Sequence, residues 1–207
     1  MKDTRFSKFV IVTNGLVPLA ILLWDAYHKR LGANPPEFMT RTTGMLTLIF
    51  LTITLAVTPV RKIIGLNWLT KFRRMLGLFA FFYGFLHLLT YIWFDRYLNF
   101  RSIPGDVVTR PFIAFGMVAF LLMVPLAITS TNKMIKRLGG KRWAKLHKVI
   151  YAAGLAGALH FFLFVKSDTR LPLTFGFVIL LLLAHRLFVK FYPPQVEEID
   201  RSVVPRR

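Results

Sequence analysis

Long apolar stretches alternate with short polar connections along the whole chain. Six stretches reach or approach the roughly 20 residues that an α-helix needs to cross the hydrocarbon core of a bilayer. They occupy residues 9–27, 44–60, 75–94, 111–128, 149–165 and 171–188. Because the connections between them are short, we expect one compact bundle of six transmembrane helices. We expect an all-α, polytopic membrane protein without a separate soluble domain.

Proline and glycine indicate where these helices begin and end. Pro35 and Pro36 break the chain before the second helix, and Pro59 is expected to end that helix. A turn is expected at Gly139, inside the fourth connection. A double proline at 193–194 is expected to stop the last helix, so that residues 193–207 form a polar tail.

Composition supports a membrane protein. The chain is 55% hydrophobic and its mean hydropathy is +0.54, which is too apolar for an ordinary soluble domain. We expect one transmembrane domain over residues 9–192, between a tail at 1–8 and the tail at 193–207. Cysteine is absent, which excludes thiolate-held iron–sulfur clusters, C-x-x-C-H haem attachment and disulfides.

The net charge of +19 is distributed over the connections and is not gathered in one patch, which argues against nucleic-acid binding. Twenty of the 28 basic residues lie in the two tails, at the end of the last helix (Arg186 and Lys190) and in the second and fourth connections. The other eight lie in connections on the opposite side. The positive-inside rule therefore predicts that both termini are cytoplasmic.

Three histidines, His87, His147 and His160, lie in apolar segments. Ionisable side chains in a bilayer are costly and usually functional. No carboxylate lies at a similar depth, which argues against a proton relay and favours axial ligands of haem. His87 lies thirteen residues beyond Arg74, and His160 thirteen beyond His147. His87 and His160 therefore each lie roughly 20 Å further along their helices than Arg74 and His147, at similar depth on parallel helices. Two imidazoles in these positions could hold one iron between them. The alternative is two polar side chains bonded to backbone or water.

His147 lacks an obvious partner. The position at matching depth on the third helix is Arg74, which is not a normal haem ligand but pairs well with propionates. His147 therefore ligates a second haem with an unidentified partner, contacts a flavin or quinone, or is an interfacial histidine. On an ideal helix it points some 140° away from His160. His185, on the last helix, could be the missing partner, but it is expected to lie deeper than His147 by a turn or more, and a packed or interfacial role is favoured.

Other residues near the histidines are candidates for cofactor binding. Gly84 and Gly157 each precede a histidine in the pattern G-x-L-H. A glycine three residues before a histidine leaves the helix surface open, so that a flat macrocycle could lie against it. Close packing of helices through small residues is the alternative.

Two arginines and two tyrosines complete the candidate set. Arg73 and Arg74 either anchor the third helix at the membrane surface or contact a propionate or a flavin phosphate. Tyr91 and Tyr151 each follow a histidine by four residues and so share its helix face, where aromatic packing is the default.

Several short runs resemble the MsrQ (YedZ) family, over about residues 10–192. They are LGANP at 31–35, TPVR at 58–61, RRMLGL at 73–78, LHL at 86–88, TS at 129–130, LGGKRW at 138–143, LHKVIY at 146–151 and LHF at 159–161. The family belongs to the ferric-reductase-like transmembrane group, which includes NADPH oxidases and STEAP proteins. Residues 9–192 would then be the ferric-reductase-like haem domain, and His87, His147 and His160 fall on the family's histidine positions.

The resemblance implies a cytochrome b of the bacterial inner membrane. It implies non-covalent haem b (one haem, or two if His147 holds a second) and FMN. Electrons would come from the quinone pool or from a cytosolic flavin reductase. They would pass to a periplasmic molybdopterin-dependent methionine sulfoxide reductase (MsrP-like), which repairs oxidised periplasmic proteins. We expect no counterpart of the soluble FAD/NADPH domain of the NADPH oxidases.

We therefore interpret the chain as the electron-transfer subunit of an oxidoreductase complex, with no substrate-reducing site of its own. The alternative is a histidine-based transporter or channel for protons or metal ions. None of the nine acidic residues lies in the middle of an apolar segment, and transport relays usually use such carboxylates. No H-E-x-x-H sequence of an intramembrane metalloprotease occurs.

Overall fold

The computed structural model describes residues 4–191, and within them every regular element is helical. The long helices are α1 (Thr4–Tyr27), α2 (Pro35–Ile64), α3 (Arg73–Thr90), α5 (Pro111–Ile128), α8 (Ile150–Phe164) and α9 (Arg170–Phe191). The short α-helices are α4 (Ile103–Thr109), α6 (Asn132–Leu138) and α7 (Gly140–Leu146). Single turns of 3-10 or π type lie at Asn67–Lys71, Tyr91–Asp95, Phe100–Ser102 and His147–Val149. Six helical segments of this part are long and apolar enough to cross a membrane, which confirms the predicted polytopic bundle.

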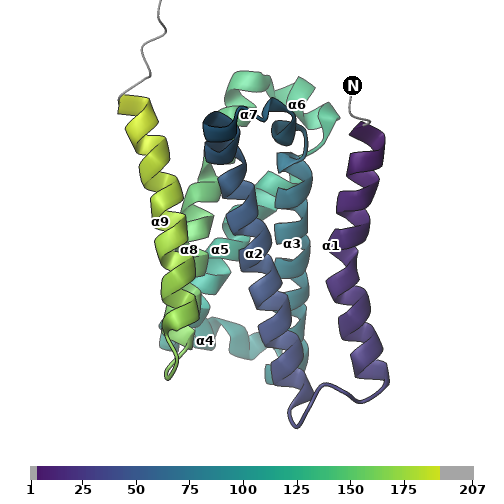
Figure 1. Cartoon of the computed structure of the whole chain (residues 1–207). Coiled ribbons are helices and arrows are strands. Elements are labelled where there is room, and N and C mark those ends of the chain that lie inside the picture. The colour runs from purple at the N-terminus through teal and green to yellow at the C-terminus, as the bar shows by residue number, and fades with distance from the viewer. Residues whose placement is uncertain (1–3, 192–207) are drawn as a thin grey trace, which may run out of the picture.

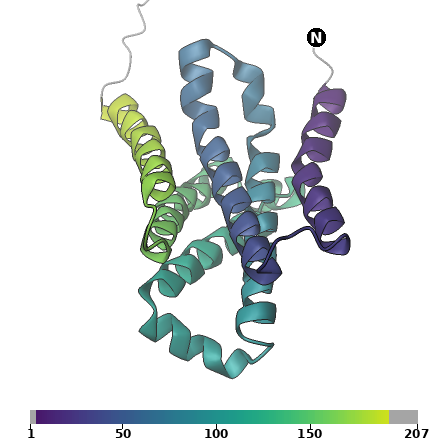
Figure 2. The ribbon, with the colours of Figure 1, turned by 60° about the horizontal axis from the view of Figure 1, so that its bottom comes forward.

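The bundle has two distinct ends. Helix α2 packs against α3 and α9, α5 packs against α8, and α8 packs against α9. In Figure 1 the start of α1, the end of α9 and the helices α6 and α7 all lie at one end, here called the tail end. Helix α4 lies at the opposite end, here called the cap end. Figure 2 brings the cap end forward and shows how the connection from α3 to α5 spreads across it.

Helix α2 begins and ends at recognisable capping residues. The side chain of Asn34 accepts a hydrogen bond from the backbone of Glu37, and Pro35 occupies the first helical turn, which confirms the predicted break. The helix begins nine residues before the predicted Gly44. Its early polar residues are threonines such as Thr43, whose hydroxyl donates to the Met39 carbonyl at 2.8 Å. These hydroxyls are satisfied by the helix itself, so polar positions need not end it.

The prediction that Pro59 ends the second helix is wrong. The helix continues to Ile64 and stops at Gly65, which has a left-handed backbone with φ of 75°. Proline has no N–H, so the carbonyl four residues before it, that of Leu55, lacks its helical donor. Arg186 of α9 donates a hydrogen bond to this carbonyl, with Nη2 2.9 Å from the oxygen. A side chain from a distant helix therefore satisfies the backbone and lets the helix pass through proline.

The fourth connection contains more structure than the sequence predicts. The turn at Gly139 is confirmed, since this residue has φ of 76° and separates α6 from α7. Helix α8 begins at Ile150, after the 3-10 turn His147–Val149. His147 and His160 are therefore not on one continuous α-helix. The predicted stop at 193–194 and the polar tail lie outside the described residues.

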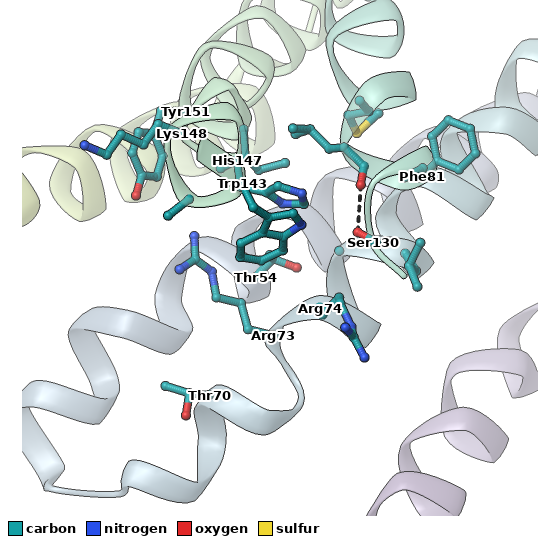
Figure 3. Close-up of a pocket in the computed structure, with 17 residues that line it drawn as sticks. Thr54, Thr70, Arg73, Arg74, Phe81, Ser130, Trp143, His147, Lys148 and Tyr151 are labelled. Carbon is teal, nitrogen blue, oxygen red and sulfur yellow. Dashed lines mark hydrogen bonds between the residues drawn. The ribbon is translucent and has the colours of Figure 1, made fainter. Parts of the chain in front are cut away.

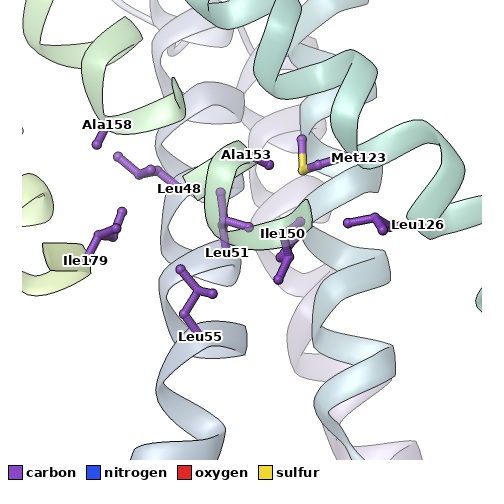
Figure 4. Packing of buried hydrophobic residues seen from close by; sticks show 10 residues of the cluster. Leu48, Leu51, Leu55, Met123, Leu126, Ile150, Ala153, Ala158 and Ile179 are labelled. Atoms are coloured by element: carbon purple, nitrogen blue, oxygen red, sulfur yellow. The ribbon is translucent and has the colours of Figure 1, made fainter. Parts of the chain in front are cut away.

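A core of aliphatic side chains fills the middle of the bundle (Figure 4). Leu51, Leu55 and Ile179 are at most 1% exposed. Small residues on α8 bring the helices close together, because a Cβ on Gly154 would lie 3.1 Å from a methyl carbon of Leu55. This core separates the cap end from the tail end, and each end carries a group of polar side chains.

Candidate functional site

His87 and His160 face each other near the cap end. Their ring centroids are 5.8 Å apart and the ring planes are inclined at 76°. His87 precedes the last residue of α3 by three positions, and His160 precedes the last residue of α8 by four. At 1.5 Å per residue both rings belong to the last helical turn, about 5 Å from the end of each helix. The structure therefore brings together the two histidines that the sequence places at equal depth.

Each ring is held by a backbone carbonyl of a neighbouring helix. His87 Nδ1 lies 2.9 Å from the Thr40 oxygen of α2, and His160 Nδ1 lies 2.6 Å from the Phe112 oxygen of α5. A carbonyl only accepts, so Nδ1 carries the proton in both rings and Nε2 keeps a free lone pair. Metal-binding histidines are oriented in this way, with the second nitrogen fixed by a hydrogen bond.

A glycine makes room for each imidazole. Gly44 follows Thr40 by four residues, and Gly116 follows Phe112 by four, so each lies one turn from the carbonyl that holds the ring. A Cβ on Gly44 would lie 3.0 Å from His87 Nδ1, and one on Gly116 would lie 2.6 Å from His160 Nδ1. The same arrangement therefore occurs twice, once on α2 and once on α5.

This pair suits one particular kind of metal group. Among the described residues, no group of three or more histidine and acidic side chains could hold a bare metal ion. Two neutral imidazoles with free Nε2 atoms fit a metal whose other ligands come from a macrocycle, as in a bis-histidine haem.

The glycines of the two G-x-L-H patterns lie against side chains. A Cβ on Gly84 would lie 3.2 Å from the Met123 methyl carbon and 3.4 Å from that of Thr47. A Cβ on Gly157 would lie 3.7 Å from a Leu48 methyl carbon. These contacts are those of closely packed helices, and a contact of either glycine with a macrocycle stays a prediction.

The second group of polar residues surrounds a cavity of about 400 Å³ at the tail end (Figure 3). Four residues singled out in the sequence line it together: Arg73, Arg74, His147 and Tyr151. Leu78, Phe81, Met123, Leu126, Ile150 and Trp143 contribute apolar and aromatic surface. Its volume is in the range of sites for cofactors and small molecules.

His147 is fixed within this cavity by Trp143 and Thr129. The Trp143 ring stacks on the imidazole with centroids 3.9 Å apart, and its Nε1 donates to the Thr129 carbonyl at 2.9 Å. The Thr129 hydroxyl donates to the Pro125 carbonyl at 2.7 Å and lies 3.1 Å from His147 Nε2. The Thr129 hydroxyl therefore holds the Nε2 edge of the His147 ring in place.

No second histidine lies among the cavity-lining residues of the described chain. Arg74, the position at matching depth, donates from Nη1 to the Asn132 side chain at 2.7 Å. His185 does not line the cavity, and its buried Nδ1 makes no hydrogen bond within residues 4–191. The surroundings of His147 therefore differ from those of the His87–His160 pair.

Tyr91 belongs to a network that ties the cap to α3. Its hydroxyl donates to Asp106 Oδ2 at 2.6 Å, and Arg96 Nε lies 3.0 Å from the same oxygen. Arg110 Nε lies 3.6 Å from Asp106 Oδ1. Asp106 is buried and belongs to α4. One carboxylate therefore joins α4, the start of α5 and the π-turn that follows the helix bearing His87.

Several of these residues were missed in the sequence. Gly44 and Gly116 make room for histidines of other helices, so no spacing within one helix indicates their role. Trp143 precedes His147 by four residues, a spacing that places them on one helical face, and this signal was available. The charge pattern places Arg186 only among the basic residues of the cytoplasmic side. Its position at the end of an apolar run, directly after His185, is the signal that it could lie within the bundle.

Replacing Asp106 by asparagine is expected to destabilise the cap end. The substitution leaves the largely buried Arg96 without its charged partner and weakens the bond from Tyr91, at a cost of about 2 kcal/mol. We expect a lower midpoint of thermal unfolding in detergent, followed by tryptophan fluorescence. Asp168→Asn is the matched control, because its pair with Arg170 is exposed and 4.0 Å long. Equal midpoints for the two variants would contradict a structural role of Asp106.

Comparison with known proteins identifies the family. Residues 42–158, more than half of the chain, match the family described as "Ferric reductase like transmembrane component". The chain is 48% identical over 183 residues to the protein-methionine-sulfoxide reductase heme-binding subunit MsrQ of Herminiimonas arsenicoxydans, covering 87% of this chain and 84% of that protein. It is 52% identical over 188 residues to the protein of the same name from Rhodospirillum rubrum, covering 90% of each. The chain therefore belongs to the MsrQ family of ferric-reductase-like membrane proteins.

Proposed function

We propose that this chain is a membrane cytochrome b subunit that passes electrons through haem b to a methionine sulfoxide reductase. The observation that carries the proposal is the paired arrangement of His87 and His160, each with Nδ1 on a backbone carbonyl and Nε2 free. Relatives at 48% and 52% identity are named heme-binding subunits. His87 and His160 would be the axial ligands, and haem would supply one-electron chemistry without an open coordination site.

The proposed orientation places both tails in the cytoplasm of a bacterium and the cap end at the outer face of its inner membrane. The excess of basic residues in the tails and in the tail-end connections supports this orientation. The His87–His160 pair would then lie close to the periplasm. Its position supports delivery of electrons to a periplasmic, molybdopterin-dependent reductase, whose active site would reduce the sulfoxide. This chain would have no substrate-reducing site of its own.

Electrons would enter at the tail end, where the cavity around His147 would hold a second redox group. Three occupants are compatible with the residues: FMN, a quinone, or a second haem with His147 as one ligand. Arg73, Arg74 and Tyr151 would contact it. The donor would correspondingly be the quinone pool or a cytosolic flavin reductase. The aromatic and basic lining supports a flat cofactor at this place.

Haem content tests the ligand assignment. Pyridine haemochromogen analysis of the purified protein should give at least one haem per chain. His87→Ala or His160→Ala should remove one haem, because a single imidazole holds the iron weakly. His28→Ala is the control, since His28 is exposed and its Nδ1 is bonded to the Trp24 carbonyl. His147→Ala should remove a haem only if the cavity holds a second one. Well-folded wild type without haem, after expression with ample haem supply, would refute the proposal.

Electron delivery can be followed directly in the reduced protein. The protein in liposomes, reduced with dithionite and freed from excess reductant, should be reoxidised when the molybdopterin reductase and a methionine-sulfoxide peptide are added. Reoxidation should continue only while the sulfoxide is present, and His160→Ala should abolish it. If the reductase with substrate leaves the haem reduced, the proposed acceptor is wrong.

Orientation can be tested by cysteine labelling, because the chain contains no cysteine. Tyr97→Cys at the cap end and Lys141→Cys at the tail end are both at exposed positions. In intact spheroplasts a membrane-impermeant maleimide should label the first and not the second. After lysis both should react. The reverse pattern would place the tail end outside and would contradict electron flow toward the periplasm.

A further inference from the structure

We infer that the tail-end cavity binds the negatively charged group of a flat aromatic ligand, and that Arg73 and Arg186, on the two sides of Tyr151, bind or neutralise that group. The inference rests on the proposed function only in taking the cavity as a cofactor site. It adds that the ligand is negatively charged and that the charged group lies next to Arg73 and Tyr151. It also adds a role for Arg186, which does not line the cavity.

The cavity wall is positively charged and has no counter-charge among the residues that the structure describes. Arg73, Arg74 and Lys148 line it, and none of its described lining residues is acidic. The described acidic residues all belong to the α1–α2, α3–α5 and α8–α9 connections or the helix ends beside them, at the cap end: Asp25, Glu37, Asp95, Asp106 and Asp168. Arg73, Arg74 and Lys148 therefore have no carboxylate among the described cavity-lining residues to pair with.

Arg186 adds a charge inside the bundle. Its Nη1 donates to the Tyr151 hydroxyl and its Nη2 to the Leu55 carbonyl, and its guanidinium carbon lies 4.7 Å from the Tyr151 ring centre. Its Nε is buried without a hydrogen-bond partner, and no ion pair of Arg186 occurs within residues 4–191. An intramembrane arginine without a counter-charge is costly, and an anion in the adjacent cavity would offset that cost.

Ordinary anchoring at the membrane surface explains only part of this arrangement. It accounts for Arg74 and Lys148, which reach the tail-end surface. It does not account for Arg186, which points into the bundle. The Leu55 carbonyl needs a donor because of Pro59, but a neutral donor would satisfy it equally well. The Tyr151 ring attracts the cation but carries no net negative charge. The unexplained feature is therefore that Arg186 has no counter-charge among the described residues, and Tyr151 joins it to the cavity.

The rest of the cavity suits a flat ring. Figure 3 shows the Arg73 guanidinium and the Tyr151 side chain on one side of the cavity, with the Trp143 and His147 rings beside them. The lining residues Met123, Leu126 and Ile150 belong to the aliphatic core, and Phe81 packs against it. The anionic group would lie between Arg73 and Tyr151, and the ring would lie against Trp143. Two sources share this chemistry, a flavin phosphate and the propionates of a haem.

Pairs of probes that differ only in charge test the inference. The purified protein, with the His87–His160 haem in place, is titrated with FMN and with riboflavin, which has the same ring and no phosphate. It is titrated separately with haemin and with haemin dimethyl ester, whose propionates are neutralised. In one of these pairs the charged probe should bind about tenfold more tightly or better. Preference for FMN identifies a phosphate, and preference for haemin identifies propionates.

Variants identify which arginine causes the preference for the charged probe. Arg186→Gln should remove most of the preference by weakening only the charged probe, and Arg186→Lys should restore part of it. Arg142→Gln is the matched control, because Arg142 is an exposed arginine at the same end that does not line the cavity. If Arg186→Gln loses its haem spectrum and so is misfolded, Arg73→Gln replaces it with the same expected result.

The outcomes separate this inference from the proposed function. Equal binding of charged and neutral probes in both pairs, no binding of any probe, or an unchanged preference in the folded variants would overturn the inference. The haem spectrum of the His87–His160 site, recorded in the same samples, would be unaffected by that failure. Loss of this spectrum in the wild type would instead refute the proposed function.

Discussion

The absence of water inside a bilayer is the constraint on which the rest of this structure depends. Each polar group within the bundle must find its partner in the protein. Thr43 bonds to its own helix, the carbonyl freed by Pro59 accepts from Arg186, and His87 and His160 bond to carbonyls of neighbouring helices. The same bonds that satisfy the backbone also aim the two imidazoles at each other. Structural stability and the geometry of the site therefore have one origin.

The sequence predicts those features that depend on one helix at a time. The helix Pro111–Ile128 has the predicted limits, because an apolar run between a proline and a polar segment defines it completely. The equal depth of His87 and His160 also follows from counting residues along two helices. Both inferences need only the rise of an α-helix and the thickness of a membrane.

Features that join two helices could not be predicted in this way. Pro59 is a helix end by local rules, whereas in the structure it is an interior residue and Arg186 on α9 supplies the donor that its ring removes. The role of Gly44 and Gly116 is visible only in the folded bundle, where His87 and His160 pack against them. Tyr91 and Tyr151 occupy equivalent positions after a histidine, yet one bonds to Asp106 in the cap and the other to Arg186 beside the cavity. Partners that are far apart in the chain decide these differences.

The aliphatic core has a consequence for the energetics of electron transfer. Along α2, Leu48 and Leu51 lie in the interval between Gly44 at the histidine pair and Thr54 at the cavity, and the buried residues of the described core cluster are all apolar. The buried residues of the described core cluster offer no ionisable side chain, and the Thr47 and Thr52 hydroxyls beside it donate within α2. An electron crossing this layer therefore travels without a proton, and the step is electrogenic. In the proposed orientation the electron moves toward the positive side of an energised membrane, which releases about 2.3 kcal/mol for each 100 mV across the full thickness. The membrane potential would then drive electrons outward for repair and would fall slightly with each one that crosses.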